Sequence, residues 1–379
     1  MKIAFIYDFV YPYHVGGIER INKIESETLA KSKTYEVHFF TMQWKGMQKE
    51  FIENNVNYHT FGSATIESMY RHRRRSIRKS IIFSISMFRL FRYRFDALII
   101  DEFPFTHIIP ILIYSKIYNV CLIMRVAEVW SREYWINYAG FIFGNLGYFL
   151  SRMVVNSANL YITNSSHNAK MLHNEFNVKQ NKINVFTPVI DYKLMLDVKK
   201  SFNGNFEYDV FFAGRLIKEK RLDLFIEIIK KIKESKPNIR AIIVGDGPER
   251  VHIASMIKKY KLDKNIKMLM PIKENFELYS LMCRSHLLLN MSEREGLSMI
   301  TLESLALGTP AVIPANSPIP NEVGSMCIKA DFDSIPNRII KIIESYDRSI
   351  FIKNSNNLKR FYYSEINSFY TKLFRRISG

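Results

Sequence analysis

Cysteine is scarce in this sequence. Its 379 residues include only Cys121, Cys283 and Cys327, which are far apart and form no C-x-x-C pair. A widely spaced, odd set argues against a disulfide framework and a cysteine-type zinc site, and it indicates a reducing compartment. The nine histidines include no H-E-x-x-H pattern, and no D-x-D lies in a plausible ligand loop. We therefore expect no metal and no other cofactor.

Long apolar runs are missing as well. No uncharged apolar stretch reaches 18 residues, and the longest uncharged stretch, residues 136–151, contains three glycines and two asparagines. Residues 2–7 are too short and too mixed for a signal peptide. The sequence predicts a cytoplasmic protein without a membrane span, with a buried or interfacial helix at 136–151.

Acidic residues are outnumbered. There are 36 Asp and Glu against 54 Lys and Arg, which gives a net charge of +18. Such an excess fits nucleic acid, an anionic membrane surface or acidic ligands such as nucleotide diphosphates. The excess is shared equally by residues 1–190 and the remainder, so no basic tail explains it.

What is present fits two globular domains. The length exceeds one ordinary core, and 47% hydrophobic with 24% charged residues argues against disorder for most of the chain. Short apolar runs alternate with helical periods, which is typical of parallel sheets flanked by helices. Predicted strands are 2–7, 37–41, 97–101, 120–126, 160–163, 183–186, 208–213, 239–244, 266–269, 287–290 and 311–313, with a helix at 222–235.

The predicted fold class is therefore α/β, with two Rossmann-like domains that face each other across a cleft. The first domain is residues 1–190 and the second is 208–355. Residues 190–207 interrupt the pattern, and 201–205 are predicted to be a linker. Aromatic and aliphatic residues at helical spacing predict a final helix within 356–379 that packs on the core.

Residues 295–303 offer a diphosphate site. Ser298 is a candidate N-cap for a helix that ends before Gly308, and the free amides that follow it would bind phosphate. Glu303 lies about 6 Å further along the axis, where it could bind a ribose, and Glu295 would lie on the sugar side. The alternative is a helix with two surface glutamates. The candidate donor-binding residues here are Gly296, Leu297, Ser298, Met299 and Glu303.

Three further loops follow predicted strands. Arg215 and Lys220, five residues apart, could both bind one diphosphate and neutralise it as a leaving group. Gly16 and Gly17 open a helix and allow a ligand close to the backbone, with positive φ at no steric cost. Gly245 begins a similar strand-to-helix turn. Each loop read alone is equally compatible with a plain structural turn.

Together these motifs resemble retaining glycosyltransferase family 4 (glycosyl transferases group 1), which has the GT-B fold. The family's G-R-x-x-x-x-K falls on residues 214–220, V-G-D-G-P on 244–248, the glutamate pair on Glu295 and Glu303, and G-G-x-E on 16–19. The resemblance implies a nucleotide sugar bound mainly by the C-terminal domain and retention at the anomeric carbon. The acceptor is predicted to be a glycan or, if the basic segment at residues 71–94 docks on membrane, a lipid-linked glycan. The resemblance also implies catalytic roles for Arg215, Lys220 and Glu295, a ribose contact for Glu303, work in glycan and cell-envelope polysaccharide synthesis, and a last helix that crosses back to the N-terminal domain.

One departure from the family pattern leaves alternatives open. Family members often carry a histidine after the fourth N-terminal strand, where this sequence has Ala127. A catalytically silent GT-B subunit that binds glycan, membrane or a partner protein is therefore the second hypothesis. A nucleotide-sugar epimerase on the same fold is a third.

Residues 71–94 are basic and contain no acid. Two arginine-rich clusters flank an apolar stretch at 81–88, which suits a helix lying in an anionic membrane interface on the inner face of the cell membrane. The alternative is a solvated basic face over a core helix. Nucleic acid is not expected as a partner, because no nucleic-acid motif surrounds the cluster. The candidate membrane or acceptor residues are Arg73, Arg74, Arg75, Arg78 and Lys79.

Overall fold

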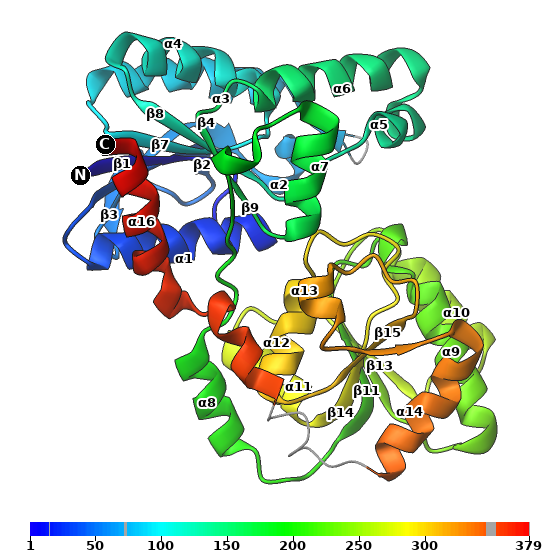
Figure 1. The fold of residues 1–379 in the computed structure, drawn as a ribbon. Helices are drawn as coiled ribbons and strands as arrows, with labels where there is room; N and C mark the ends of the chain where they lie inside the picture. The colour runs from blue at the N-terminus through cyan, green and yellow to red at the C-terminus, as the bar shows by residue number, and fades with distance from the viewer. Residues whose placement is uncertain (15, 72–73, 346–353, 379) are drawn as a thin grey trace. The chain divides into compact units, whose positions relative to one another are not determined.

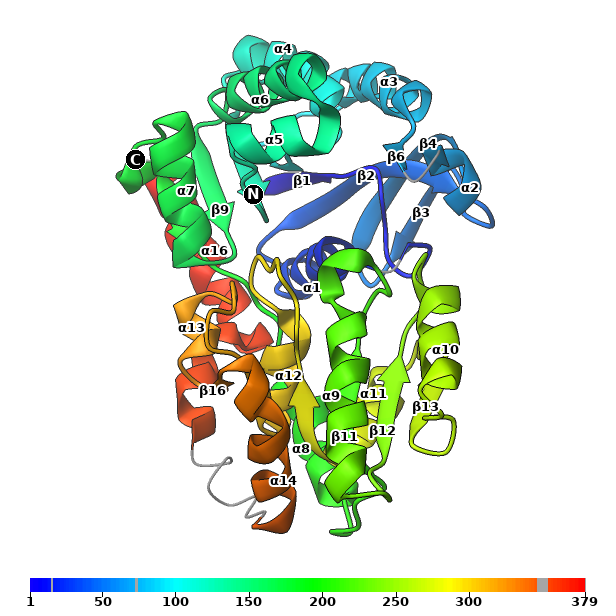
Figure 2. The same ribbon diagram turned by 90° about the vertical axis from the view of Figure 1, so that its right-hand side faces the viewer.

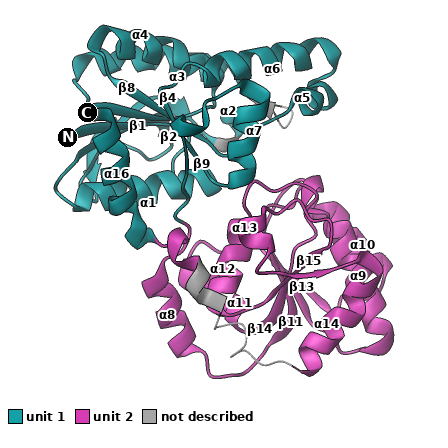
Figure 3. Cartoon of the chain, viewed as in Figure 1, with its two compact units in different colours: residues 1–188, 363–379 teal, residues 189–362 magenta. Residues whose placement is uncertain are grey.

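The computed structural model describes residues 1–14, 16–71, 74–345 and 354–378 (Figure 1). The chain forms two compact units: unit 1 is Met1–Pro188 with Tyr363–Gly379, and unit 2 is Val189–Tyr362 (Figure 3). Each unit contains a largely parallel sheet with helices on both faces, so the predicted class of two Rossmann-like α/β domains is confirmed.

Unit 1 is built on an eight-stranded sheet of order β10-β9-β8-β7-β1-β2-β4-β3. Every strand pair is parallel except β3 with β4. The central strands are buried on both faces, which is why they read as continuous apolar runs. The strands are β1 (Lys2–Ile6), β2 (Glu36–Trp44), β3 (Glu50–Glu53), β4 (Val56–Ala64), β7 (Ala97–Asp101), β8 (Cys121–Val126), β9 (Leu160–Thr163) and β10 (Ile183–Val185), with a separate small pair β5 (Tyr70–Arg71) and β6 (Arg74–Arg75).

The β3–β4 hairpin was missed from the sequence. Its turn is Asn54-Asn55, and both residues have positive φ, 49° and 66°. Two-residue hairpin turns of this kind need positive φ at both central positions, and asparagine tolerates it better than other non-glycine residues. The Asn-Asn pair in the sequence was the signal from which this hairpin turn could have been predicted. Strand β16 in unit 2 was missed too.

Helices cover both faces of the unit 1 sheet. Helices α1 and α16 lie on one face, and α3, α4 and α6 lie on the other (Figures 1 and 2). The helices are α1 (Gly17–Lys31), α2 (Ile66–Met69), α3 (Ile77–Ser86), α4 (Ile108–Tyr118), α5 (Arg132–Ala139), α6 (Phe141–Val155), α7 (Ser166–Phe176) and α16 (Ile366–Ser378), with 3₁₀ turns η1 (Met87–Arg92), η2 (Phe105–His107), η3 (Gln180–Lys182) and η7 (Tyr363–Glu365).

The uncharged stretch 136–151 is not one helix. It breaks at Gly140 (φ 81°), where α5 ends and α6 begins. The two helices then pack closely: a Cβ on Gly144 would lie 2.5 Å from the Cα of Ile136, and one on Gly147 would lie 2.6 Å from the Trp135 ring. Glycine is therefore needed at both positions. Much of α6 is also exposed, so of the two predicted alternatives, a buried or an interfacial helix, the buried one is wrong for this part.

A buried ion cluster joins α1, β7, β8 and α16 inside unit 1. The Arg125 guanidinium donates hydrogen bonds to Glu25 and Asn22 and, at 3.2 Å, to the Tyr370 hydroxyl. Tyr370 in turn donates to Glu25 at 2.6 Å, and Asn22 donates to Asp101 at 2.8 Å. Burial raises the pKa of Asp101 to about 7 and also raises that of Glu25, although Arg125 opposes both shifts.

Unit 2 is built on a six-stranded, wholly parallel sheet of order β13-β12-β11-β14-β15-β16. Its strands are β11 (Tyr208–Ala213), β12 (Ala241–Val244), β13 (Ile266–Leu269), β14 (Ser285–Leu289), β15 (Ala311–Pro314) and β16 (Ile328–Ala330). Its helices are α8 (Tyr192–Ser201), α9 (Leu222–Ser235), α10 (Arg250–Lys259), α11 (Asn275–Cys283), α12 (Met299–Leu307), α13 (Asn321–Gly324) and α14 (Ile335–Glu344), with η4 (Lys218–Lys220), η5 (Phe332–Ser334) and η6 (Asn354–Phe361).

The unit boundaries differ from the predicted segments. Residues 192–201 form helix α8 of unit 2, and the predicted linker at 201–205 follows that helix within the same unit. Residues 356–379 are not one helix, because η6 and η7 precede α16. Helix α16 belongs to unit 1.

Candidate functional site

The candidate site lies where the strand order of unit 2 reverses. Strand β11 has β12 on one side and β14 on the other, so the chain leaves β11 and β14 in opposite directions. Ligands in open parallel sheets bind outside the carboxyl ends of the strands at such a switch point. The loop after β11 carries Arg215 and Lys220, and the loop after β14 carries Glu295. The topology therefore brings these two loops to one edge of the sheet.

Lys220 and Glu295 contact each other directly. The Lys220 Nζ lies 2.5 Å from Oε1 of Glu295, although the two residues are 75 positions apart. Glu295 is mostly buried, with 9% of its side chain exposed. Asn290 donates to the same carboxylate oxygen at 3.4 Å. The pair places a cation and an anion together beside the start of α12.

Arg215 is an exposed side chain in the same loop. Within the described part of the chain it makes no side-chain hydrogen bond or ion pair. A guanidinium that the fold does not use for its own stability is available to a ligand, and its planar fork suits phosphate oxygens.

The turn at Gly245 packs directly against the loop that carries Arg215. A Cβ on Gly245 would lie 1.9 Å from the carbonyl oxygen of Gly214, and one on Gly247 would lie 2.4 Å from that of Leu216. Leu216 N–H also donates to the Asp246 carbonyl at 2.9 Å. Glycine at 245 therefore has a structural role here, because it lets two loops touch through their backbones.

We expect Gly245→Ala to destabilise the protein by about 2 kcal/mol or more, because the added methyl must push one loop away from the other. Chemical unfolding measures the change. Gly204→Ala is the matched control: Gly204 also has positive φ (87°), but no atom lies within 4 Å of its added Cβ. It should cost about 1 kcal/mol from backbone strain alone. Equal costs for the two variants would show that the loop contact is unimportant.

Ser298 precedes α12 but does not cap it with its side chain, contrary to the prediction. Its backbone is left-handed (φ 70°), and its Oγ accepts from Asn290 at 2.9 Å and lies 2.8 Å from Oγ1 of Thr301. Asn290 also donates to Thr301 and accepts from Ser292. Sequence reasoning missed Asn290, although a polar residue directly after β14 was a signal.

The amides at the start of α12 remain available. The N–H groups of Met299, Ile300 and Thr301 have no hydrogen-bond acceptor among the residues the structure describes, since the first bond of the helix runs from Leu302 to Ser298. Three free N–H groups and the positive end of the helix dipole favour a bound anion. Gly296 is half-buried beside them and Leu297 is buried.

Glu303 lies one turn into α12 and is buried, with 2% exposed. The hydroxyl of Tyr279, on α11, donates to its Oε1 at 2.6 Å. That bond fixes the orientation of the carboxylate. Tyr279 was missed from the sequence, because no local pattern connects it to a residue 24 positions away.

The loop at residues 16–19 belongs to unit 1 and differs from its prediction. Gly16 is extended (φ −152°) and Gly17 is the first residue of α1, so neither uses positive φ. A Cβ on Gly16 would lie 2.3 Å from a carboxylate oxygen of Glu19, and the other oxygen of Glu19 contacts Nδ1 of His14 at 2.8 Å. Gly16 thus leaves room for the buried Glu19 side chain.

Ala127 follows β8 in unit 1. Its carbonyl oxygen accepts hydrogen bonds from Asn164 and Asn168, both at 2.8 Å. The backbone at this position is therefore held in place, while the side chain offers no polar group.

The basic segment is described in part. Arg73 lies outside the described residues, and for Arg74 and Arg75 only the backbone, strand β6, is described. Arg78 is exposed on α3, and Lys79 donates to the Ser63 carbonyl at 2.5 Å. Among the described residues, no group of histidine, cysteine and acidic side chains could hold a metal ion. In the same residues, every helix is too short or too polar to cross a bilayer.

Comparison with known proteins identifies the domain. Residues 197–357 match the family "Glycosyl transferases group 1". One relative belongs to the phosphatidylinositol N-acetylglucosaminyltransferase of Arabidopsis thaliana and is 28% identical over 132 residues, which are 35% of this chain and 29% of that protein. An uncharacterized glycosyltransferase of Methanocaldococcus jannaschii is 24% identical over 213 residues, 54% of this chain and 52% of that one. The chain thus spans about half or less of the curated relatives it matches.

Solved structures are similar over the whole chain. Sucrose-phosphate synthase of Thermosynechococcus elongatus superimposes with a TM-score of 0.79 at 13% identity, covering 99% of this chain and 98% of the other. Anabaena HepE, solved with UDP-glucose, gives 0.72 at 16% identity, covering 99% and 100%. At such identities the likeness shows the fold. The chain therefore has the GT-B fold, and its residues 197–357 match the family of glycosyl transferases group 1.

Proposed function

We propose that this protein is a retaining glycosyltransferase. It moves a hexosyl group from a nucleotide sugar to a glycan or lipid-linked glycan at the cytoplasmic face of the membrane. One observation carries the proposal: the switch point of unit 2 gathers an exposed Arg215, the Lys220–Glu295 pair and three free amides at the start of α12. Arg215, Lys220 and the amides are the donors that a nucleotide diphosphate needs.

Each group has a part in the transfer. Arg215 and the α12 amides bind the diphosphate and stabilise the charge that develops on it as its bond to the anomeric carbon breaks. Glu303, held by Tyr279, accepts hydrogen bonds from the ribose. Glu295 lies beside the sugar, with Lys220 balancing its charge. The acceptor oxygen bonds to the anomeric carbon on the same face, and its proton passes to the departing phosphate.

The relatives support both ends of this reaction. The Arabidopsis relative is named for transfer of N-acetylglucosamine to phosphatidylinositol, a lipid acceptor. HepE holds UDP-glucose. We infer the same classes of donor and acceptor for this chain.

A thermal-shift screen of nucleoside diphosphates and nucleotide sugars tests the donor site. A ligand at 100 times its dissociation constant should add about 2.7 kcal/mol to the free energy of unfolding. We expect one nucleotide class to stabilise the wild type, and the shift to be lost in Arg215→Ala and Glu303→Gln. Lys218→Ala, an exposed lysine in the same loop, is the matched control and should keep the shift.

A silent protein with the GT-B fold is the second candidate. Ala127 favours it, because no imidazole follows β8 to contact a donor sugar. Stabilisation by no nucleotide in a folded protein would favour this candidate over the enzyme.

A further inference from the structure

Three helices of unit 1 present apolar stripes to solvent. On α3, α4 and α6, large apolar side chains recur every three or four residues and are exposed by 40–76%. A helix that packs on a sheet normally has polar residues on its outer side. The stripes are Ile77, Ile81 and Ile85, continued by Phe88, on α3 and η1; Ile109, Ile113 and Ile117 on α4; and Ile142, Leu146, Phe149 and Met153 on α6.

Helix α6 exposes more large apolar side chains than α3 or α4. It begins with Phe141-Ile142-Phe143, exposed by 71%, 75% and 71%. In the described part of the chain, 22 large hydrophobic side chains are exposed. Thirteen of them, including Phe141, Ile142 and Phe143, lie on α3, η1, α4 and α6. Clustering of this degree is typical of a surface that meets another phase or molecule.

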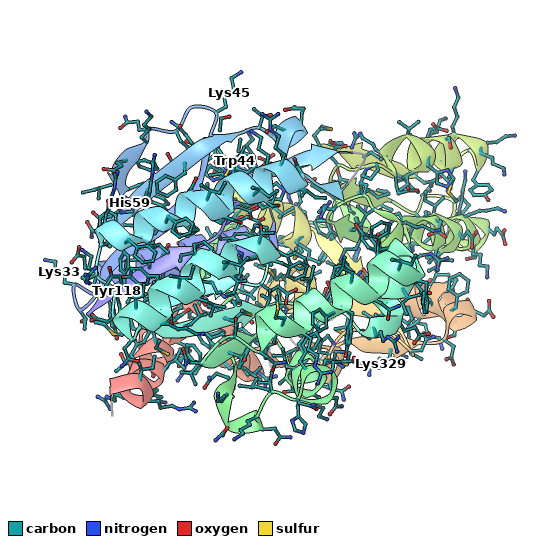
Figure 4. All side chains as sticks on the ribbon, turned by 90° about the horizontal axis from the view of Figure 1, so that it is seen from above. Lys33, Trp44, Lys45, His59, Tyr118 and Lys329 are labelled. Atoms are coloured by element: carbon teal, nitrogen blue, oxygen red, sulfur yellow. The ribbon has the colours of Figure 1, made fainter. Side chains whose placement is uncertain are left out.

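The three helices cover the same face of the sheet. They connect β4 to β7, β7 to β8 and β8 to β9, and all three crossovers advance in the same direction along the sheet. Right-handed crossovers that advance in one direction place their helices on one face. Figure 4 looks down on this face, with α3, α4 and α6 lying side by side and Tyr118 at the end of α4. We call this surface the α3–α4–α6 face.

The charges on this face have one sign. The three helices carry Arg78, Lys79, Lys116 and Arg152 and no acidic residue. The chain has no acid between Glu67 and Asp96 either. A second copy of the chain would bring like charges together, whereas anionic lipid would neutralise them. Apolar side chains between basic ones suit a membrane interface.

The α5–α6 hairpin adds interface-seeking aromatics. The rings of Trp130, Tyr134, Trp135 and Tyr138 form one cluster, in which Trp130 lies 4.7–5.2 Å from the other three and Tyr138 lies 6.3–6.4 Å from Tyr134 and Trp135, centre to centre. Trp135 is buried in this cluster, and Tyr138 is 44% exposed. Tryptophan and tyrosine are enriched where hydrocarbon meets lipid headgroups. Close packing at Gly144 and Gly147 makes the hairpin rigid, so its apolar side stays presented.

We infer that the α3–α4–α6 face docks on an anionic bilayer, with the apolar stripes entering the headgroup region and the arginines and lysines binding phosphate. The sequence prediction placed docking in residues 71–94, and the structure extends it to α4 and α6. The inference deepens the proposed function by naming the surface that brings a lipid-linked acceptor within reach. Vesicle binding needs no nucleotide sugar, so the docking inference and the proposed function can be contradicted separately.

Flotation with vesicles of phosphatidylcholine containing about one third phosphatidylglycerol tests the docking. The wild type should float with these vesicles and bind pure phosphatidylcholine at least about tenfold more weakly. The triple variant Ile142→Ser, Leu146→Ser, Phe149→Ser should bind the anionic vesicles at least about tenfold more weakly than the wild type. Thermal unfolding should be unchanged, because these side chains are exposed. The control Ile52→Ser, Val251→Ser changes two equally exposed residues elsewhere and should bind normally.

Three outcomes would overturn the inference. They are no flotation of the wild type, equal binding by the triple variant, and equal binding to neutral vesicles. Loss of a dimer in the triple variant, measured by light scattering, with no vesicle binding would assign the face to a second copy instead. A wild type that floats yet binds no nucleotide would contradict the proposed function and leave the docking intact.

Discussion

Arg215→Ala should lower kcat for sugar transfer about 100- to 1,000-fold, the range found when one preorganised donor to a developing anion is removed. The guanidinium is exposed and makes no bond within the described part of the chain, so its removal should leave folding unaffected. The loss should fall on kcat more than on KM, because charge on the diphosphate grows as the glycosidic bond breaks. Steady-state kinetics with the donor found in the thermal-shift screen gives both constants.

Two variants sharpen this test. Arg215→Lys keeps the charge but not the planar fork and should fall between wild type and alanine. Lys218→Ala removes an exposed charge from the same loop and should change kcat less than about threefold. If Arg215→Ala retains wild-type kcat, the guanidinium does not contact the leaving group, and the proposed role is wrong.

Arg125→Met should be the most destabilising substitution proposed, at about 3–5 kcal/mol, because it removes the cation from a buried cluster and leaves its carboxyl groups unpaired. Glu25 is fully buried and Asp101 is 4% exposed. Urea unfolding followed by circular dichroism measures the change. Arg152→Met, on the exposed outer side of α6, is the matched control and should stay within about 0.5 kcal/mol of wild type.

The pH dependence separates charge from packing in this cluster. Asp101 has a pKa of about 7 in the folded protein, above its ordinary value of 3.8, so the folded state binds more protons than the unfolded state between these values. The contribution of Asp101 to stability should therefore be largest below about pH 4 and should be lost as pH rises to about 7. Asp101→Asn should remove this pH-dependent loss. Glu25 and Asp101 take up protons toward pH 4, so the loss of stability caused by Arg125→Met should become smaller there. If the loss is as large near pH 4 as near pH 7, the electrostatic explanation is wrong.

The sequence was sufficient where the information is local. Strands β1, β7 and β11 are continuous buried apolar runs, and Arg215 and Lys220 follow β11 in one loop, so each could be placed without a partner. Residues 295–303 were placed for the same reason, because a strand, a loop and a helix follow one another.

What could not be predicted depends on contacts between distant residues. Lys220 meets Glu295 across 75 positions, and Tyr279 orients Glu303 from another helix. Ser298 was expected to cap α12, but Asn290 competes for its hydroxyl and the backbone turns left-handed. The α3–α4–α6 face was only partly visible, because the apolar period of a docking stripe looks the same as that of a core stripe.

Helix α16 completes unit 1 from the far end of the chain, after all of unit 2. During synthesis, α1 and β8 leave the ribosome long before Tyr370. Glu25 and Arg125 therefore lack their hydrogen bonds to the Tyr370 hydroxyl while unit 2 is being made. Unit 2 is continuous and can fold as it emerges, whereas unit 1 can reach its final state only after α16 has been made. A C-terminal tag or truncation that disturbs Tyr370 or its neighbours would therefore act on the N-terminal unit, where chaperones would meet the unfinished core.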